Sequence, residues 1–329
     1  MAMKKGLLRF GVAVLIVLAL VFAADRVIGR VMNNLLPMIS NHGDSGKTYF
    51  SLHDVNTPIV IVGSSRAAHH YVTEMIEDSL KMPAYNVAID GCFFSYNCCV
   101  INSILERYSP KLIIWENGNE YLYDGIADPL EALYPYYTKN EWVLRTIQEE
   151  KPWTEYVRLN SDIYRYNSKI HRILIRYMTR HSFVDGTIKG YEPSPKKQLK
   201  KQLELEKETV ESTSLSETKI ERFRYTLERA QKMGVCIVVV DSPKYLLRSY
   251  DNISASKMQE LCNQFGALYL DNSQLPYFLE HPELFNDSVH LNDDGAKLYT
   301  SLFLNTIKHF MSDSIPNNKP FEKRPCSVN

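Results

Sequence analysis

Five short apolar runs, separated in most places by helix-length amphipathic stretches, constrain the fold of this 329-residue chain more than any other feature. They cover residues 58–63, 84–89, 111–116, 235–241 and 267–271. Runs that are apolar on both faces and alternate with helices are typical of a parallel sheet covered on both sides. We therefore predict an α/β fold, a three-layer α/β/α sandwich with a five-stranded parallel, flavodoxin-like sheet.

The gap between the third and fourth runs is too long for one crossover helix. Within it, the stretch SDIYRYNSKIHRILIRYM has the apolar spacing of an amphipathic helix. We predict a helical insertion at about 125–215 inside a single α/β domain that spans 58–312. Glycines, a proline and polar residues over 37–57 indicate a linker ahead of this domain, and residues 313–329 form a polar tail.

The N-terminus has the pattern of an export signal. Lys4, Lys5 and Arg9 precede residues 10–24, which carry no charge. Two interpretations are open, a cleaved signal peptide or an uncleaved signal anchor, and both direct the rest of the chain out of the cytoplasm. We favour an anchor with a juxtamembrane helix over residues 1–36, because the helical pattern continues past the apolar run without a small-residue break.

Charge and cysteine content exclude several functional classes. Lys plus Arg and Asp plus Glu both number 38, so no overall field attracts nucleic acid. The six cysteines form no CxxC pair and have no histidine partner at metal-ligand spacing. We therefore expect no nucleic-acid partner, no metal and no organic cofactor.

Polar residues follow the first three runs directly, and another group precedes a late helix. Ligands of parallel α/β sheets bind at the carboxyl ends of the strands, so chemistry is expected there. The residues are Gly63, Ser64 and Ser65 after the first run, Asp90 and Gly91 after the second, Asn117 and Asn119 after the third, and the late pair Asp287 and His290.

In this order the blocks resemble the SGNH, or GDSL-type, hydrolase superfamily. That family has Gly-Asp-Ser after the first strand, Asn-x-Gly-x-x-Gly after the second, Gly-x-Asn-Asp after the third and a late Asp-x-x-His. The corresponding stretches here are GSS at 63–65, NVAIDG at 86–91, NGNE at 117–120 and DSVH at 287–290. The resemblance spans roughly residues 58–310 and implies a serine esterase or acyltransferase.

Four positions depart from the family pattern. Ser64 replaces the usual Asp, Ala88 replaces the first Gly of the second block, and Asn117 and Glu120 replace a Gly and an Asp of the third. None of them is a triad position. They indicate a divergent branch, so the substrate does not follow from the family.

The chemistry of these residue types is coherent. A serine hydroxyl needs an imidazole to remove its proton and a carboxylate to hold that imidazole in the right tautomer. We assign Ser65 as nucleophile, since it has the family's serine position, His290 as base and Asp287 as the orienting carboxylate. The backbone N–H groups of Ser65 and Gly91 and the side chain of Asn119 are the candidate oxyanion-hole donors.

Each catalytic assignment has a structural alternative. Ser64 and Ser65 suit the N-cap of the helix that follows them, and Asp287 or Asp293 suits the cap of the last helix. His290 alone has the character of a surface histidine.

Other polar residues also have two interpretations. Asn117 is an alternative to Asn119 in the oxyanion hole. Arg66 suits either an acidic substrate group or a salt bridge at the mouth of the site, and we expect His69 and His70 to pack or to face solvent. Aromatic faces suit sugar rings, but tyrosines in the loop after the third strand equally suit contact between the insertion and the sheet; they are Tyr121, Tyr123, Tyr134, Tyr136 and Tyr137.

We therefore expect an exported, membrane-anchored serine esterase or acyltransferase. Its substrate would be an O-acyl group, such as acetyl, on an extracytoplasmic glycan or envelope polymer, attacked through an acyl-serine intermediate. The alternative is a catalytically silent SGNH-like module that binds a glycan or an envelope-assembly partner.

Overall fold

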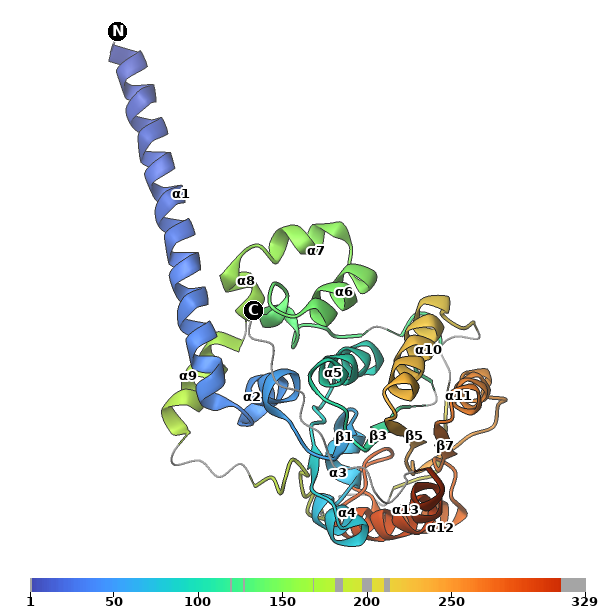
Figure 1. Cartoon of the computed structure of the whole chain (residues 1–329). Coiled ribbons are helices and arrows are strands. Elements are labelled where there is room, and N and C mark those ends of the chain that lie inside the picture. The colour runs from blue at the N-terminus through green and yellow to red at the C-terminus, as the bar shows by residue number, and fades with distance from the viewer. Residues whose placement is uncertain are drawn as a thin grey trace. The chain divides into compact units, whose positions relative to one another are not determined.

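A computed structural model describes residues 2–118, 120–126, 128–167, 169–180, 186–196, 203–209 and 214–314. The chain divides into two compact units (Figure 1). The α/β unit comprises residues 50–130 and 184–329, and the helical unit comprises residues 1–49 and 131–183. The expected insertion is therefore shared between the units, because its first part packs with the N-terminal segment and its second part returns to the α/β unit.

The α/β unit is built on a five-stranded, all-parallel sheet, as the sequence predicts. The strands lie in the order β2-β1-β3-β5-β7, and β4 and β6 form a separate two-stranded sheet. In chain order this is 2-1-3-4-5, the flavodoxin-like arrangement, in which ligands bind where the strand order reverses beside β1. The bounds are β1 Ile59–Val62, β2 Ala84–Asn86, β3 Leu112–Glu116, β4 Glu206–Lys207, β5 Cys236–Asp241, β6 Leu246–Leu247 and β7 Leu268–Asp271.

Helices cover both faces of the sheet. Ile61 and Ile114 lie side by side on adjacent strands and belong to the core cluster shared with α3, α4 and α13. Val62 and Trp115, one residue further along, point to the opposite face, where the Trp115 ring lies 5.9 Å from Phe94 of α5. The helices of this unit are α3 Ser65–His70, α4 Thr73–Leu80, α5 Phe94–Arg107, α10 Glu217–Lys232, α11 Ile253–Gln264, α12 Pro276–Glu280 and α13 Asp293–Ser314, with a π-helical turn η2 at Phe50–Asp54 and a 3-10 turn η4 at Pro282–Leu284.

The helical unit contains the long N-terminal helix and four shorter helices from the insertion. Its elements are α1 Ala2–Leu35, η1 Leu36–Ile39, α2 Gly43–Tyr49, η3 Tyr134–Tyr136, α6 Glu141–Glu150, α7 Trp153–Arg158, α8 Asp162–Tyr166 and α9 Lys169–Thr179. Residues 37–57, expected as a linker, are largely helical here, and the boundary between the two units falls inside them.

Helix α1 has two parts of different character. Its most apolar 18 residues have a mean hydropathy of 2.7 and none of them is buried, so this part is long and apolar enough to cross a membrane. From Asp25 onward one stripe of the helix is buried, at Asp25, Gly29 and Met32, and it continues to Leu36 at the start of η1. That spacing is the helical repeat, so the second part of α1 is a packing element of the helical unit.

Two glycines provide a matched test of how segment 186–196 is held against the sheet. The amide of Asn86 at the end of β2 donates to the Lys189 carbonyl at 3.0 Å. Gly190 has φ +82°, and a Cβ there would lie 1.8 Å from the Asn86 carbonyl oxygen, whereas Gly266 has φ +69° with nothing within 4 Å of its Cβ position. Both positions favour glycine, but only Gly190 is also sterically closed.

We expect Gly266→Ala to lower the free energy of unfolding by about 1 kcal/mol, the cost of a left-handed alanine. Gly190→Ala should cost about 1–3 kcal/mol more, because the added methyl group displaces the chain from the end of β2. Urea unfolding of the full chain in detergent measures both. Equal costs for the two variants would show that segment 186–196 does not contact β2 this closely.

Candidate active site

Three side chains that are far apart in the sequence meet at the carboxyl edge of the sheet. The Ser65 Oγ lies 2.7 Å from His290 Nε2, across 225 residues of chain. On the other side of the imidazole, His290 Nδ1 lies 2.9 Å from both carboxylate oxygens of Asp287. The structure thus brings together all three members of the candidate triad, Ser65, His290 and Asp287, in hydrogen-bonding order.

The position of Ser65 follows from the turn after β1. A Cβ at Gly63 would lie 2.9 Å from the backbone oxygen of Glu116, so only glycine permits this approach of β1 to β3. Ser65 is then the first residue of α3, and Ser64 precedes the helix without a side-chain capping bond. The capping alternative therefore does not describe Ser65, whose hydroxyl bonds to His290.

The base is held by a loop that is closed by its own hydrogen bonds. The Asn286 N–H donates to the His290 carbonyl at 2.8 Å, and the Val289 and His290 N–H groups donate to Asp287 Oδ1 at 2.9 and 2.8 Å. Asp287 is therefore not the cap of the last helix. That role belongs to Asn292, whose Oδ1 accepts from the N–H of Gly295 at 3.0 Å.

Electrostatics keep Asp287 ionised. Partial burial opposes its charge, but the hydrogen bonds from His290 and from the Val289 N–H outweigh burial and lower the pKa of Asp287 to about 2. An ionised carboxylate accepts a hydrogen bond from Nδ1–H, which leaves the lone pair of Nε2 directed at the Ser65 hydroxyl. This is the tautomer that a general base for serine requires.

The described residues include two of the three expected oxyanion-hole donors, the N–H groups of Ser65 and Gly91. Ser65 N–H is at the start of α3, where no preceding turn of helix can accept its proton. Gly91 has φ +70°, is exposed, and has open space around its Cβ position. Asn119 lies outside the described residues.

Asn117 is not a substitute for Asn119. It is fully buried, its N–H donates to the Val240 carbonyl at 2.7 Å, and its Nδ2 lies 3.6 Å from the sulfur of Met258. This side chain therefore belongs to the packing of the sheet and does not reach Ser65.

His70 is a residue of the site that the sequence did not single out. It is fully buried, its Nε2 accepts from the Leu291 N–H at 3.0 Å, and its Nδ1 lies 2.8 Å from Ser242 Oγ. Because Nε2 accepts, Nδ1 carries the proton and donates to Ser242, whose hydroxyl lies 2.9 Å from Glu116 Oε1. Since Leu291 follows His290 directly, His70 fixes the backbone of the base loop.

Arg66 forms salt bridges and does not face a substrate. Its buried guanidinium pairs with Asp241 and lies 3.4 Å from Glu116. Burial raises the pKa of Glu116, although the charge of Arg66 opposes that rise. The salt-bridge interpretation of Arg66 is therefore correct, but the bridge lies under the site and not at its mouth.

Ligand atoms of His69, Asp90 and Glu192 lie within 4.8 Å of one another beside the site. His69 Nδ1 bonds to the Glu192 carbonyl at 2.7 Å, which turns its Nε2 toward Asp90, 3.7 Å away. Asp90 immediately precedes Gly91, and the His69 ring is 6.1 Å from the ring of His290. These are ligand types that divalent cations accept, and they are the residues in this part of the structure that are able to hold a metal.

The tyrosines expected as a sugar platform are mostly core residues. Tyr121, Tyr123, Tyr134 and Tyr136 are all buried. The first two belong to the α/β unit and the others to the helical unit. They contribute packing and give no support to a carbohydrate surface.

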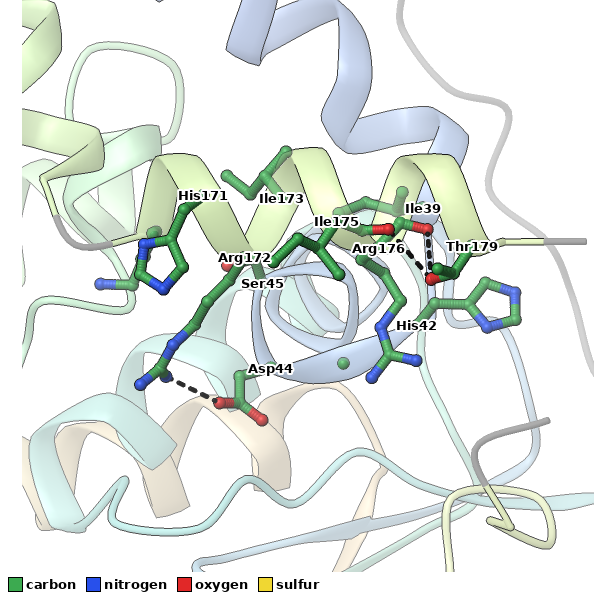
Figure 2. Close-up of a pocket in the computed structure, with 12 residues that line it drawn as sticks. Ile39, His42, Asp44, Ser45, His171, Arg172, Ile173, Ile175, Arg176 and Thr179 are labelled. Atoms are coloured by element: carbon green, nitrogen blue, oxygen red, sulfur yellow. Dashed lines mark hydrogen bonds and ion pairs between the residues drawn. The ribbon is translucent and has the colours of Figure 1, made fainter. Parts of the chain in front are cut away.

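A separate cavity of about 410 Å³ lies in the helical unit, between α9 and the start of α2 (Figure 2). Its lining includes Arg172 and Arg176 from one face of α9, with Asp44 opposite and 3.8 Å from Arg172. Its lining residues all belong to the helical unit, and none of them is a member of the candidate triad. The candidate active site is thus defined by side-chain geometry in the α/β unit and not by this cavity.

No model of a known protein family matches the chain, and no curated protein matches it either.

We expect His70 to make stability depend on pH. Burial, reinforced by the charge of Arg66, lowers the pKa of His70 well below its ordinary value of 6.5. Below about pH 6.5 the unfolded chain therefore binds a proton that the folded chain does not, and the free energy of unfolding should fall by up to about 1.4 kcal/mol per pH unit.

Urea unfolding of the full chain between about pH 7 and pH 5 measures this slope. His70→Gln should flatten it, because glutamine does not titrate. His281→Gln is the matched control, since His281 is at the surface beside Glu283, and it should keep the slope. The same slope in the His70→Gln variant as in the unaltered chain would contradict a neutral, buried His70.

Proposed function

We propose that this protein is a serine esterase or acyltransferase of the SGNH class that uses Ser65, His290 and Asp287. The observation that carries the proposal is the continuous hydrogen-bonded series from Asp287 through His290 to Ser65 at 2.9 and 2.7 Å. It occurs at the carboxyl edge of a flavodoxin-like sheet, directly after β1. The four sequence blocks that resemble the SGNH family support the same class.

The proposed reaction has two steps. The Ser65 hydroxyl passes its proton to His290 Nε2 while Oγ attacks the ester carbonyl, and the N–H groups of Ser65 and Gly91 stabilise the oxyanion. The alcohol leaves with the proton from His290, which gives an acyl-Ser65 intermediate. Water or a sugar hydroxyl then attacks the acyl group, transfers its proton to His290 and releases Ser65; water as acceptor gives an esterase, and a sugar gives a transferase.

The proposed substrate is an O-acyl group, such as acetyl, on an extracytoplasmic glycan or envelope polymer. Support comes from the N-terminal basic residues and the apolar part of α1, a pattern typical of exported chains. Because the four tyrosines are buried, they give no support to a sugar substrate.

A catalytically silent module remains the alternative function, and covalent labelling separates the two. We expect a fluorophosphonate probe to label the full chain in detergent at one site and Ser65→Ala to abolish labelling, since only an activated serine reacts. Ser64→Ala is the matched control, because Ser64 is adjacent and buried, whereas the hydroxyl bonded to His290 is that of Ser65. A folded chain that takes up no probe would indicate the silent module.

Hydrolysis of p-nitrophenyl acetate should rank the three triad residues. Ser65→Ala and His290→Ala should each lower kcat by about 10⁶-fold, and Asp287→Asn by about 10⁴-fold, because the amide no longer selects the required tautomer. Full activity in all three variants would show that the residues are not the catalytic machinery.

A further inference from the structure

Helix α8 is fixed to α1 at the point where the apolar part of α1 ends. Asp25 is the first charged residue after the uncharged run 10–24. Its carboxylate accepts from the Ser161 hydroxyl at 2.6 Å and from the N–H groups of Asp162 and Ile163 at 2.9 Å each. Asp25 follows the run directly, and a helix rises only about 1.5 Å per residue. Because these bonds join Asp25 to the first residues of α8, the start of α8 lies level with the end of the apolar run.

Close packing makes this contact a rigid one. A Cβ at Gly29, one turn beyond Asp25, would lie 2.3 Å from Asp162 Cγ, so only glycine admits α8 this close. Arg26 also bonds to Asp162, at 3.2 Å. The height of α8 along α1 is therefore determined by side-chain contacts and not by a flexible connection.

Helix α7 presents an apolar face next to this point. Trp153 and Val157 are four residues apart, so they share one face of the helix, and they are 71% and 61% exposed. Buried Leu159 connects α7 to α8, and Ile163 in the first turn of α8 is 38% exposed.

Exposed apolar side chains are concentrated in this unit. Among the described residues beyond Asp25, fifteen large apolar side chains are exposed, and nine of them belong to the helical unit, although it is much the smaller of the two. Tryptophan with a neighbouring aliphatic residue on an exposed helix face is typical of the interfacial layer of a bilayer.

We propose that the outer face of α7, formed by Trp153 and Val157, inserts into the interfacial layer of the membrane that α1 enters. The helical unit is then attached to the bilayer at two points, α1 and α7, and is held at a fixed orientation to it. This inference rests on α1 being a membrane helix and does not depend on the chemistry at Ser65.

The charges around α7 indicate which lipids the face requires. Lys151 and Arg158 flank it, but Glu149 and Glu150 directly precede Lys151. With both signs present, insertion depends on apolar burial and not on attraction to anionic headgroups. A zwitterionic phosphatidylcholine bilayer should therefore be sufficient.

Tryptophan quenching of the full chain in phosphatidylcholine nanodiscs tests the proposal. The chain has three tryptophans, at 115, 142 and 153, so the difference between the unaltered chain and Trp153→Phe isolates the emission of Trp153. We expect lipids brominated near the headgroup end of the acyl chain to quench this component. We also expect the nanodisc to protect it from quenching by aqueous iodide. The Trp142→Phe difference, from the same unit, is the matched control and should keep its iodide quenching.

Three results would overturn the proposal. If iodide quenches Trp153 in nanodiscs as strongly in the unaltered chain as in a Val157→Ser variant, α7 lies in water. The apolar face would then be left for a protein partner. Bromolipid quenching of Trp142 equal to that of Trp153 would show no specific insertion of α7. Recovery of the mature chain without residues before Asp25 would remove the anchor itself. Fluorophosphonate labelling of Ser65 is unaffected by any of these results, so the two proposals fail independently.

Discussion

The arrangement of the site depends on one buried cation, the guanidinium of Arg66. It follows Ser65 directly and pairs with Glu116 at the end of β3 and Asp241 at the end of β5. Removing one partner of such a buried pair leaves an uncompensated charge, at a cost of about 3–5 kcal/mol. The carboxyl ends of three neighbouring strands, β1, β3 and β5, are thus held together by charge directly beneath the nucleophile.

The same carboxylates connect this ion pair to the base loop. Glu116 accepts from the Ser242 hydroxyl, Ser242 accepts from His70, and His70 accepts from the Leu291 N–H. A network in which each buried polar group has a partner is rigid and permits one geometry. Ser65 and His290, the proposed nucleophile and base, are therefore positioned by one hydrogen-bonded system, although they come from opposite ends of the α/β unit.

The sheet and the meeting of Ser65 with His290 and Asp287 were predictable from sequence, because both leave local signals. An apolar run bounded by a glycine identifies β1, and its carboxyl end places Ser65. The role of His70 was not predictable, since its partners are single residues at unrelated positions with no spacing pattern. The division into two units was also missed, because the contact between Asp25 and α8 joins segments 137 residues apart through one carboxylate.

The helical insertion between β3 and β5 has a consequence for biosynthesis. Strand β1 and Ser65, which follows it, are made early, whereas β5 and the loop with His290 are made only after the insertion. Long-range parallel pairing of this kind forms slowly. In the proposed enzyme, the nascent chain therefore carries Ser65 without His290 until almost the whole polypeptide has emerged, so the order of synthesis itself keeps the growing protein unreactive.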